Sequence, residues 1–561
     1  MNAAFDSLAE RVVKEHWDFY PTAGSRIGRH EYDGQLPDLS PHRITRRVEE
    51  LRRGLAQLSG LADGNSRAGT GEPEDRLTYR LLELFLRREL FNLEEMRTLE
   101  NNPMRQVGYL NVGGYVKRDY APLVDRLRSA TEAMEQVPDF LNVVDAALAP
   151  ELSRPVLEMS IESYRGMARF YRVDLGVDPD QSGSDVNDAE TLAKFDQARE
   201  QAARALDGFV VKLEERLARM PEGAEGDFAI GSQLYSDMLA YGEGVNVPLR
   251  DIIELGQANM ERNLERLAEA TAAVGPGRSI RDIVGEIGRN HPAAEALIPE
   301  TRAMLEDIRQ SLLDHDIISL PAEDRCQVIE TPTYMRYAFA AMDSPGSLET
   351  RSTESYYYVT PVEETWTDAQ AEEWLSNFNY DTLRIISIHE VYPGHFVHHL
   401  HNSYGRPLPL VNRVASSYAF TEGWAHYTEE MMLETEYARG QAALRVTQLL
   451  EALVRNCRYL CALGMHTQGM TVDEATRFFM DNAYMEELPA RREALRGTFD
   501  PGYLNYTLGK LMILKLREDY RREQGSAYTL KGFHDRLLSY GAPPLPLLRE
   551  VMLANPGDGP L

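Results

Sequence analysis

The sequence is poor in cysteine and has no long apolar run, and both absences exclude classes of protein. Its three cysteines are too few for a disulfide framework and lack zinc-finger spacing; they are Cys326, Cys457 and Cys461. We therefore expect a reducing compartment and a cytoplasmic location. No stretch of about 18 consecutive apolar residues occurs, and the N-terminal residues lack the basic and apolar parts of a secretory signal. A membrane span or membrane partner is therefore not expected.

Positive charge is also scarce, since 60 Lys and Arg residues face 88 Asp and Glu residues and the formal net charge is −28. Such a balance argues against a phosphate-binding surface, so no nucleic-acid partner is expected. The sequence has no Walker loop, no Rossmann glycine fingerprint and no Gly-x-Ser-x-Gly elbow, which disfavours nucleotide-binding enzymes and serine hydrolases. The 43% hydrophobic content over 561 residues is enough for a sizeable globular core.

Most of the chain shows the periodicity of amphipathic helices. The sequence has no internal repeat of fixed period. Residues 62–75, 178–189 and 221–226 are rich in loop-forming residues and predict surface loops. The segment Glu354–Thr360 contains three tyrosines and a β-branched end, and is the best candidate for a strand. Apolar residues recur at helical spacing in the segments Leu77–Leu99, Leu192–Met220, Leu249–Ala273, Gln441–Cys461, Val472–Tyr484 and Leu504–Tyr520.

Histidines gather in one short part of the chain. Six of the 13 histidines lie between His389 and His426, and an apolar run leads into the first of them. Zinc binds imidazole and carboxylate groups that converge on one point. A Glu beside the first ligand, here Glu390, can act as the base for a metal-activated water. The alternative is a hydrogen-bonded histidine cluster that holds no metal.

The spacing of the two principal histidines does not fit a regular helix. His395 follows His389 at i+6, about 240° around the axis, instead of the usual i+4. Pro393 and Gly394 lie between them, and both disrupt regular helix. We predict a bulge at Pro393-Gly394 that returns His395 to the face of His389. The rival ligand pair is His395 with His399, which are at i and i+4.

A third ligand is available further along the chain. Glu422 follows His395 by 27 residues and opens the run EGWAHYTEE. On a helix, Glu422, His426 and Glu429 fall on one face. We predict that Glu422 completes the metal site, and that His426 or Glu429 orients the histidine ligands.

At these residues the sequence resembles a known family, the bacterial domain of unknown function numbered 885. The resemblance rests on HEVYPGH from His389 and on EGWAHY from Glu422. It extends along nearly the whole chain, at Pro21-Thr22, Gly28, Glu31 to Gly34, Gly231, Tyr235, Arg458, Gly464, His466, Pro501, Tyr506 and Gly509. The chain departs from the family pattern at His398, Ala462 and Tyr503, which bears on substrate preference more than on metal binding.

The family is similar to the gluzincin metallopeptidases, in which two His and a downstream Glu hold zinc inside a helical shell. This similarity implies a peptidase or carboxypeptidase. By the same similarity, the group that stabilises the oxyanion is expected downstream, and His466 and Tyr506 are the candidates.

Other residues are candidates for contact with a substrate. Tyr357 lies in the strand candidate, whose tyrosines 356–358 could form an edge strand that pairs with peptide backbone or could simply pack in the core. His398, His399 and His401 are expected to be structural or to face the substrate. A substrate carboxylate could be received by Arg458, Lys510 or Arg517, although a structural ion pair is the alternative for each.

These observations predict a mainly α protein: a large two-lobed helical body over residues 1–561, with tentative lobes 1–230 and 231–561. A central channel and a small β-sheet near the metal helix would complete a zincin-like arrangement. We expect one Zn²⁺ per chain held by His389, His395 and Glu422, and hydrolysis of short peptides with Glu390 as base. The alternatives are a metal-dependent hydrolase of a non-peptide amide or ester, and a non-catalytic peptide-binding pseudo-enzyme. Substrate identity, the end cleaved and oligomeric state are left open.

Overall fold

The computed structural model describes residues 3–63, 72–176, 188–221, 226–332, 339–363, 365–557 and 559–561. Helices dominate these residues, so the prediction of a mainly α protein is confirmed. The helices that precede the sheet are α1 (Ala3–Phe19), α2 (Pro21–Ile27), α3 (Pro41–Asp63), α4 (Pro73–Glu94), α5 (Thr98–Asn101), α6 (Met104–Val107), α7 (Gly113–Lys117), α8 (Leu123–Glu135), α9 (Val137–Ala147), α10 (Arg154–Arg169), α11 (Ala189–Ala218), α12 (Gly231–Glu243), α13 (Leu249–Val274), α14 (Ile280–Gly288) and α15 (Leu297–Asp314).

Three short strands follow, and the rest of the described chain is again helical. The strands are β1 (Gln327–Glu330), β2 (Ala340–Asp343) and β3 (Tyr356–Val359). The later helices are α16 (Asp368–Asn377), α17 (Tyr380–Glu390), α18 (His395–Tyr404), α19 (Leu410–Val414), α20 (Tyr418–Leu433), α21 (Ala442–Thr467), α22 (Val472–Ala483), α23 (Glu487–Phe499), α24 (Asn505–Gln524), α25 (Leu530–Leu538) and α26 (Leu545–Met552).

The six predicted helical segments all correspond to helices, namely α4, α11, α13, α21, α22 and α24. The predicted segment Leu77–Leu99 extends too far at its C-terminal end, because α4 ends at Glu94 and a separate short helix, α5, follows. The predicted loops at 62–75, 178–189 and 221–226 lie mostly outside the described residues. No described helix has both the length and the apolar character that a membrane crossing requires.

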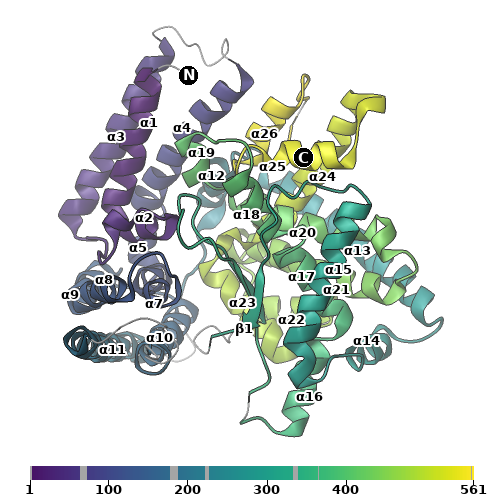
Figure 1. Ribbon diagram of the computed structural model, residues 1–561, viewed down its shortest axis with the longest axis horizontal. Coiled ribbons are helices and arrows are strands. Elements are labelled where there is room, and N and C mark those ends of the chain that lie inside the picture. The colour runs from purple at the N-terminus through teal and green to yellow at the C-terminus, as the bar shows by residue number, and fades with distance from the viewer. Residues whose placement is uncertain are drawn as a thin grey trace.

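One connected apolar core joins the first helices to the last. Helices α1 to α11 lie on the left of Figure 1 in purple and blue, most of the teal to yellow helices lie on the right, and α12 and α19 lie beside α4 between the two groups. Buried side chains of the same cluster run from Phe5 in α1 to Leu553 after α26. A smaller cluster lies among α13, α14 and α21 to α23. The N-terminal helices therefore pack against the part of the chain that carries the histidine motif.

The sheet has the order β1-β3-β2, with β1 parallel and β2 antiparallel to β3. The predicted strand is confirmed as β3, and of the two alternatives for its tyrosines the structure shows core packing and not an edge strand. Strand β3 is central and paired on both sides, and Tyr357 is fully buried with its hydroxyl 3.3 Å from Ser387 Oγ of α17. Its aromatic run reflects burial between helix and sheet, and the edge strands of this sheet are β1 and β2.

Helices α20 and α24 cross at two facing glycines. A Cβ at Gly423 would lie 2.5 Å from the Cα of Gly509, and a Cβ at Gly509 would lie 1.8 Å from the carbonyl oxygen of Ala419. Only glycine allows such a close backbone approach. The crossing brings Glu422 of α20 and Tyr506 of α24 to the same region, where both line one cavity.

Candidate metal centre

The histidine motif is divided between two helices. Helix α17 ends at Glu390, and α18 begins at His395. The predicted single bulged helix is therefore wrong in detail. Pro393 has no N–H to continue the helical ladder. A Cβ at Gly394 would lie 1.6 Å from the carbonyl oxygen of His389, so the chain can turn here only at glycine.

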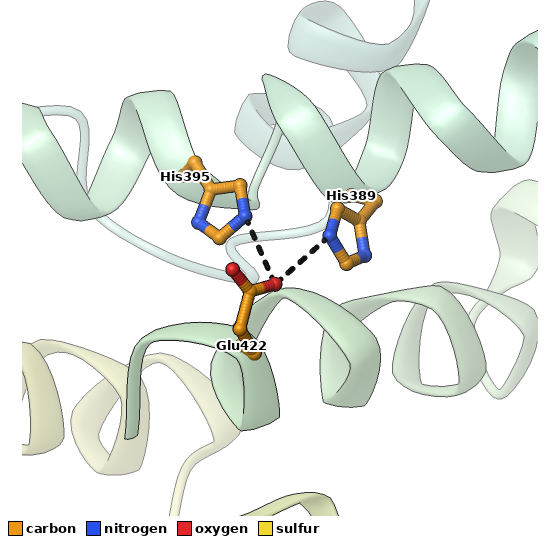
Figure 2. Close-up of side chains that lie close together, drawn as sticks. All are labelled: His389, His395 and Glu422. Carbon is orange, nitrogen blue, oxygen red and sulfur yellow. Dashed lines mark ion pairs between the residues drawn. The ribbon is translucent and has the colours of Figure 1, made fainter. Parts of the chain in front are cut away.

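The break nevertheless places the two histidines as predicted. His389 and His395 point toward Glu422 from the two ends of the break (Figure 2), and each Nε2 lies 3.6 Å from Glu422 Oε2. The three ligand atoms lie within 4.8 Å of one another. Among the described residues His395, and not His399, joins this group.

The spacing of these atoms suits a metal better than hydrogen bonds. A separation of 3.6 Å is long for a hydrogen bond. Two ligand atoms bound tetrahedrally to zinc at roughly 2.0–2.1 Å lie about 3.3 Å apart. Two His and one Glu are a donor set of catalytic zinc sites, in which a fourth position stays open for water or substrate. A small inward movement of the side chains would make this cluster fit a zinc ion.

A buried carboxylate lies behind His389. Glu429 is fully buried, and its Oε1 is 2.7 Å from His389 Nδ1. The other oxygen is 3.0 Å from Nδ1 of His426, and Arg455 Nη2 lies 3.6 Å from Oε1. Glu429 therefore fixes the ring of His389 with Nε2 directed at Glu422, and His426 and Arg455 hold Glu429.

The electrostatics of the cluster favour a positive charge at its centre. Burial opposes a charge on His389, but Glu422 and Glu429 outweigh burial and raise the pKa of His389 to about 10. Burial likewise opposes a charge on Glu422, but His395 and His389 hold the pKa of Glu422 well below its usual range. A divalent cation could take over the role of these protons.

Two more predicted residues reach the same cavity. Glu390 follows His389 directly, and its Oε2 accepts a hydrogen bond from the backbone N–H of Met342 in β2 at 3.1 Å. Tyr506 has its ring centre 6.5 Å from that of His389, and lies under the guanidinium groups of Arg458 and Arg496.

The cavity has a volume of about 760 Å³, within the range of ligand sites. Burial lowers the pKa of His398 to about 3 and that of His399 to about 4, so both line the cavity as neutral rings. The lining residues are Ala23, Arg26, Ile27, Ala340, Ala341, Met342, Ser344, Gly346, Ser347, His389, Glu390, His395, His398, His399, Asn402, Arg413, Thr421, Glu422 and Tyr506.

Other candidates lie elsewhere and already have partners. His466 is buried, does not line this cavity, and its Nε2 lies 2.7 Å from the carbonyl oxygen of Gly497. Arg458 donates two hydrogen bonds to Glu493, both at 2.7 Å. Lys510 pairs with Glu430, and Arg517 with Glu434. His401 Nε2 lies 3.0 Å from the carbonyl oxygen of Ser319, which is a structural contact.

Some lining residues were not foreseen. Arg26 and Ala23 come from α2, Arg413 comes from α19, and Met342 comes from β2. No local motif marks them, because they reach the site only through the packing of distant segments. The sequence resemblance at Pro21-Thr22 and Gly28 lies beside Arg26 and is the one signal that pointed to this region.

Comparison with known proteins decides the family. Residues 21–552 match the family described as bacterial protein of unknown function (DUF885). The chain belongs to this family. No curated protein matches the sequence.

Solved structures show the same fold as this DUF885 chain. One is a candidate lipoprotein of unknown function from Shewanella oneidensis, with 23% identity, a TM-score of 0.79, and coverage of 98% of this chain and 100% of that one. Another is a candidate lipoprotein from Colwellia psychrerythraea, with 18% identity, a TM-score of 0.77, and coverage of 97% and 98%. At these identities the likeness concerns the fold alone.

Proposed function

We propose that this protein is a zinc-dependent hydrolase of peptide bonds, with one Zn²⁺ held by His389, His395 and Glu422. The proposal rests on the convergence of these three side chains, with both histidine Nε2 atoms 3.6 Å from one Glu422 oxygen. A bound zinc ion supplies a Lewis acid that polarises the scissile carbonyl and lowers the pKa of the attacking water. The remaining chemistry belongs to residues of the chain.

Glu390 is placed to move the protons. It lines the cavity beside His389, and the hydrogen bond from Met342 N–H holds one of its oxygens and leaves the other available. It would take a proton from the attacking water and deliver it to the leaving amine. Tyr506 lines the same cavity and would donate a hydrogen bond to the carbonyl oxygen as negative charge develops there.

Strand β2 favours a peptide as the substrate. Thr360 N–H donates to the carbonyl oxygen of Phe339, so the hydrogen-bonded pairs alternate and the backbone groups of Ala340 and Met342 point away from β3. Both residues line the cavity. Among the described strands none pairs with this outer edge of β2. The N–H of Met342 already donates to Glu390, so an extended peptide would pair with the N–H of Ala340 and with the carbonyl groups of Ala340 and Met342, which a small ester could not do.

The zincin-like arrangement, the two lobes and the cellular location, all expected from the sequence, are part of the same proposal. A zincin-like arrangement would place the substrate between a lobe formed by residues 1–230 and a lobe formed by residues 231–561. A cytoplasmic location remains our prediction from composition. Relatives described as candidate lipoproteins favour the cell envelope as the alternative, which fractionation of the source cells would decide.

The test combines metal analysis with peptide digestion. Wild type, Glu390→Gln and Glu422→Ala would be expressed with zinc, analysed for metal, and incubated with a peptide library read by mass spectrometry. We expect about one zinc and cleavage for wild type, zinc but at least a ~100-fold slower reaction for Glu390→Gln, and neither for Glu422→Ala. Glu373→Gln, an exposed change on α16, is the control and should behave as wild type.

Three outcomes would contradict this proposal. A wild-type protein that binds no zinc would exclude the metal site. A Glu390→Gln variant that cleaves as fast as wild type would remove the proposed base. Zinc binding with turnover of a non-peptide amide or ester, but of no peptide, would favour the alternative substrate class.

A further inference from the structure

Two arginines in the wall of the cavity lack an acidic partner. Arg26 of α2 and Arg413 of α19 line the same cavity as the metal ligands, and no carboxylate pairs with either among the described residues. Arg118, by contrast, lies 2.7 Å from Asp343. In a chain with a formal net charge of −28, partners for cations are abundant, so two unpaired cations beside one cavity need an explanation.

Each of the two guanidinium groups uses only some of its N–H donors in hydrogen bonds among the described residues. Arg26 donates through Nη2 to the carbonyl oxygen of Gly108, and Arg413 donates through Nη2 to that of Ser347. Nε of Arg413 is buried and has no partner among the described residues. A guanidinium has five N–H donors in a planar fork that matches a carboxylate. Burial lowers the pKa of the Arg413 guanidinium, and no carboxylate offsets it.

One loop, residues 344–348, contacts both arginines. Gly346 packs against the backbone of Arg26, since a Cβ there would lie 2.3 Å from the Arg26 carbonyl oxygen. The next residue, Ser347, accepts the hydrogen bond from Arg413 and also lines the cavity. Leu348 N–H then donates to the carbonyl oxygen of Ile27 at 2.9 Å. The backbone of Arg26 and the guanidinium of Arg413, far apart in the sequence, therefore meet at one loop of the cavity wall.

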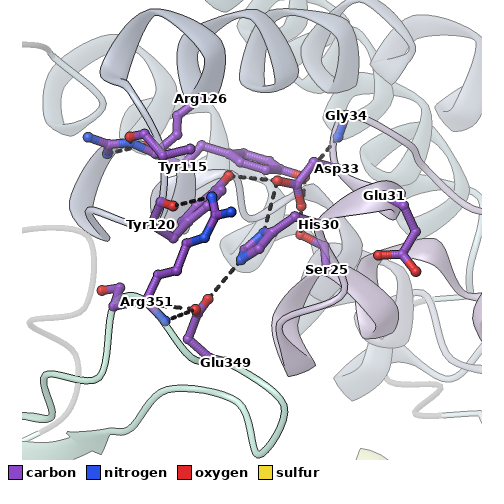
Figure 3. Close-up of polar contacts among 12 residues, drawn as sticks. Ser25, His30, Glu31, Asp33, Gly34, Tyr115, Tyr120, Arg126, Glu349 and Arg351 are labelled. Atoms are coloured by element: carbon purple, nitrogen blue, oxygen red, sulfur yellow. Dashed lines mark hydrogen bonds and ion pairs between the residues drawn. The ribbon is translucent and has the colours of Figure 1, made fainter.

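A histidine between two carboxylates helps to hold the end of α2 near the 344–348 loop. Figure 3 shows His30, four residues after Arg26, with Asp33 at one ring nitrogen (3.1 Å) and Glu349 at the other (2.8 Å). Tyr120 stacks on the His30 ring with centres 3.8 Å apart, and its hydroxyl donates to Asp33 at 2.8 Å. These contacts fix the end of α2 against the segment that follows the 344–348 loop. They also give a role to the family resemblance around Gly28 and residues 31–34, which the metal chemistry does not use.

We propose that Arg26 and Arg413 together bind a carboxylate group of the substrate. The inference rests on the proposed peptidase function and narrows its substrate class to peptides that present a carboxylate to the cavity. The carboxylate is either the free C-terminus, as in a carboxypeptidase, or an Asp or Glu side chain. Because the net charge of the protein repels anions at long range, such a group needs local cations of this kind.

The test measures binding and cleavage separately. One N-acetylated peptide of neutral residues is made with a free C-terminal carboxylate, as a C-terminal amide, and as an amide that contains one Glu. Calorimetric titration into zinc-loaded Glu390→Gln should show that a carboxylate form binds about 10- to 100-fold more tightly than the neutral amide. The form that is preferred identifies the source of the carboxylate. Wild-type cleavage of all three forms is followed in parallel.

Charge-removing variants assign that preference to the two arginines. Arg26→Gln and Arg413→Gln, each in the Glu390→Gln background, should lose most of the preference. Arg29→Gln should keep it, because Arg29 is exposed, pairs with Glu31 and does not line the cavity. Arg26 is exposed at the cavity wall, so Arg26→Gln should fold even if Arg413→Gln does not.

The failure of this inference is distinct from failure of the proposed function. Equal binding of all three forms would overturn the inference, even if wild type cleaves peptides. A preference that survives Arg26→Gln and Arg413→Gln would also overturn it, because the carboxylate would then bind elsewhere, for example at the metal. A preference that depends on both arginines, in a protein that cleaves nothing, would support carboxylate binding and reject the peptidase.

Discussion

Removing the charge behind His389 should weaken the metal site without removing a ligand. Glu429→Gln keeps the shape of the side chain but replaces the carboxylate that lies 2.7 Å from His389 Nδ1. In wild type this carboxylate accepts the Nδ1 proton, so Nε2 is left free to bind metal. A Gln amide can turn its NH₂ group toward Nδ1, which favours the other tautomer and places the proton on Nε2. The ring also loses the negative charge that makes it a better ligand.

The expected size follows from the position of Glu429. Loss of a partner that orients a metal ligand typically costs about 10- to 100-fold in metal affinity, or about 1.4–2.7 kcal/mol. Glu429 is fully buried and 2.7 Å from the ligand, so we expect a value near the upper end. The affinity would be measured by competition with a chromophoric zinc chelator at pH 7.5. Glu422→Gln, which changes a ligand itself, should weaken zinc binding more.

A matched control separates this effect from damage to the surrounding ion pairs. Arg455 lies 3.6 Å from Glu429 and also pairs with Glu451, which forms no hydrogen bond or ion pair with His389 among the described residues. Glu451→Gln therefore disturbs Arg455 but leaves the orienting carboxylate in place. If Glu429→Gln bound zinc as tightly as wild type, or if Glu451→Gln weakened binding equally, the role assigned to Glu429 would be refuted.

Three further changes have defined outcomes. Tyr506→Phe should keep the zinc and lower kcat on any substrate found, by about 3 kcal/mol of barrier if the hydroxyl binds the oxyanion; steady-state kinetics with metal analysis check this. Gly394→Ala should cost more than the ~1–3 kcal/mol of ordinary overpacking, since its Cβ would lie 1.6 Å from the His389 carbonyl oxygen, and denaturant titration measures it. Arg47 and His16 hold the buried Glu89, where burial opposes ionisation but these partners outweigh it and lower the pKa of Glu89 to about 2. The stabilisation from Glu89, at most about 3 kcal/mol, is complete above pH 4.5 and is lost as the pH falls toward 2, so Glu89→Gln should show less of this acid-dependent loss in unfolding titrations.

The convergence of His389, His395 and Glu422 could be predicted because its signal is local. His389, His395 and Glu422 occur within one stretch, in residue types that suit a single kind of ion. The backbone that joins them could not be predicted with the same accuracy. Pro393 and Gly394 marked an irregularity, but either a bulge or a break could satisfy their preferences. The structure has a break, because a new helix begins at His395 and buries its own apolar face.

Other features depended on packing between distant segments. Strand β3 was recognised from its tyrosines, but its central place depends on β1 and β2, whose sequences carry no strong pattern. The sequence offered Arg458 as a receiver of a carboxylate but favoured a structural ion pair, and it could not name the partner, because Glu493 lies on another helix. Arg26 and Arg413 could not be recognised, because the absence of a partner is a property of the fold and not of the residue.

The candidate ligands are held by contacts that do not involve the metal. His389 is fixed by the buried Glu429, and Glu422 by the close crossing of Gly423 with Gly509. Trp424, two residues after Glu422, donates through Nε1 to the carbonyl oxygen of Pro393 at 3.1 Å, and so ties α20 to the break that carries His395. Each ligand therefore has its own anchor in the core, and these anchors meet around one point. The side chains are therefore already in place before a cation binds. Little of the cation's binding free energy would be lost in ordering them, so most of it would appear as affinity.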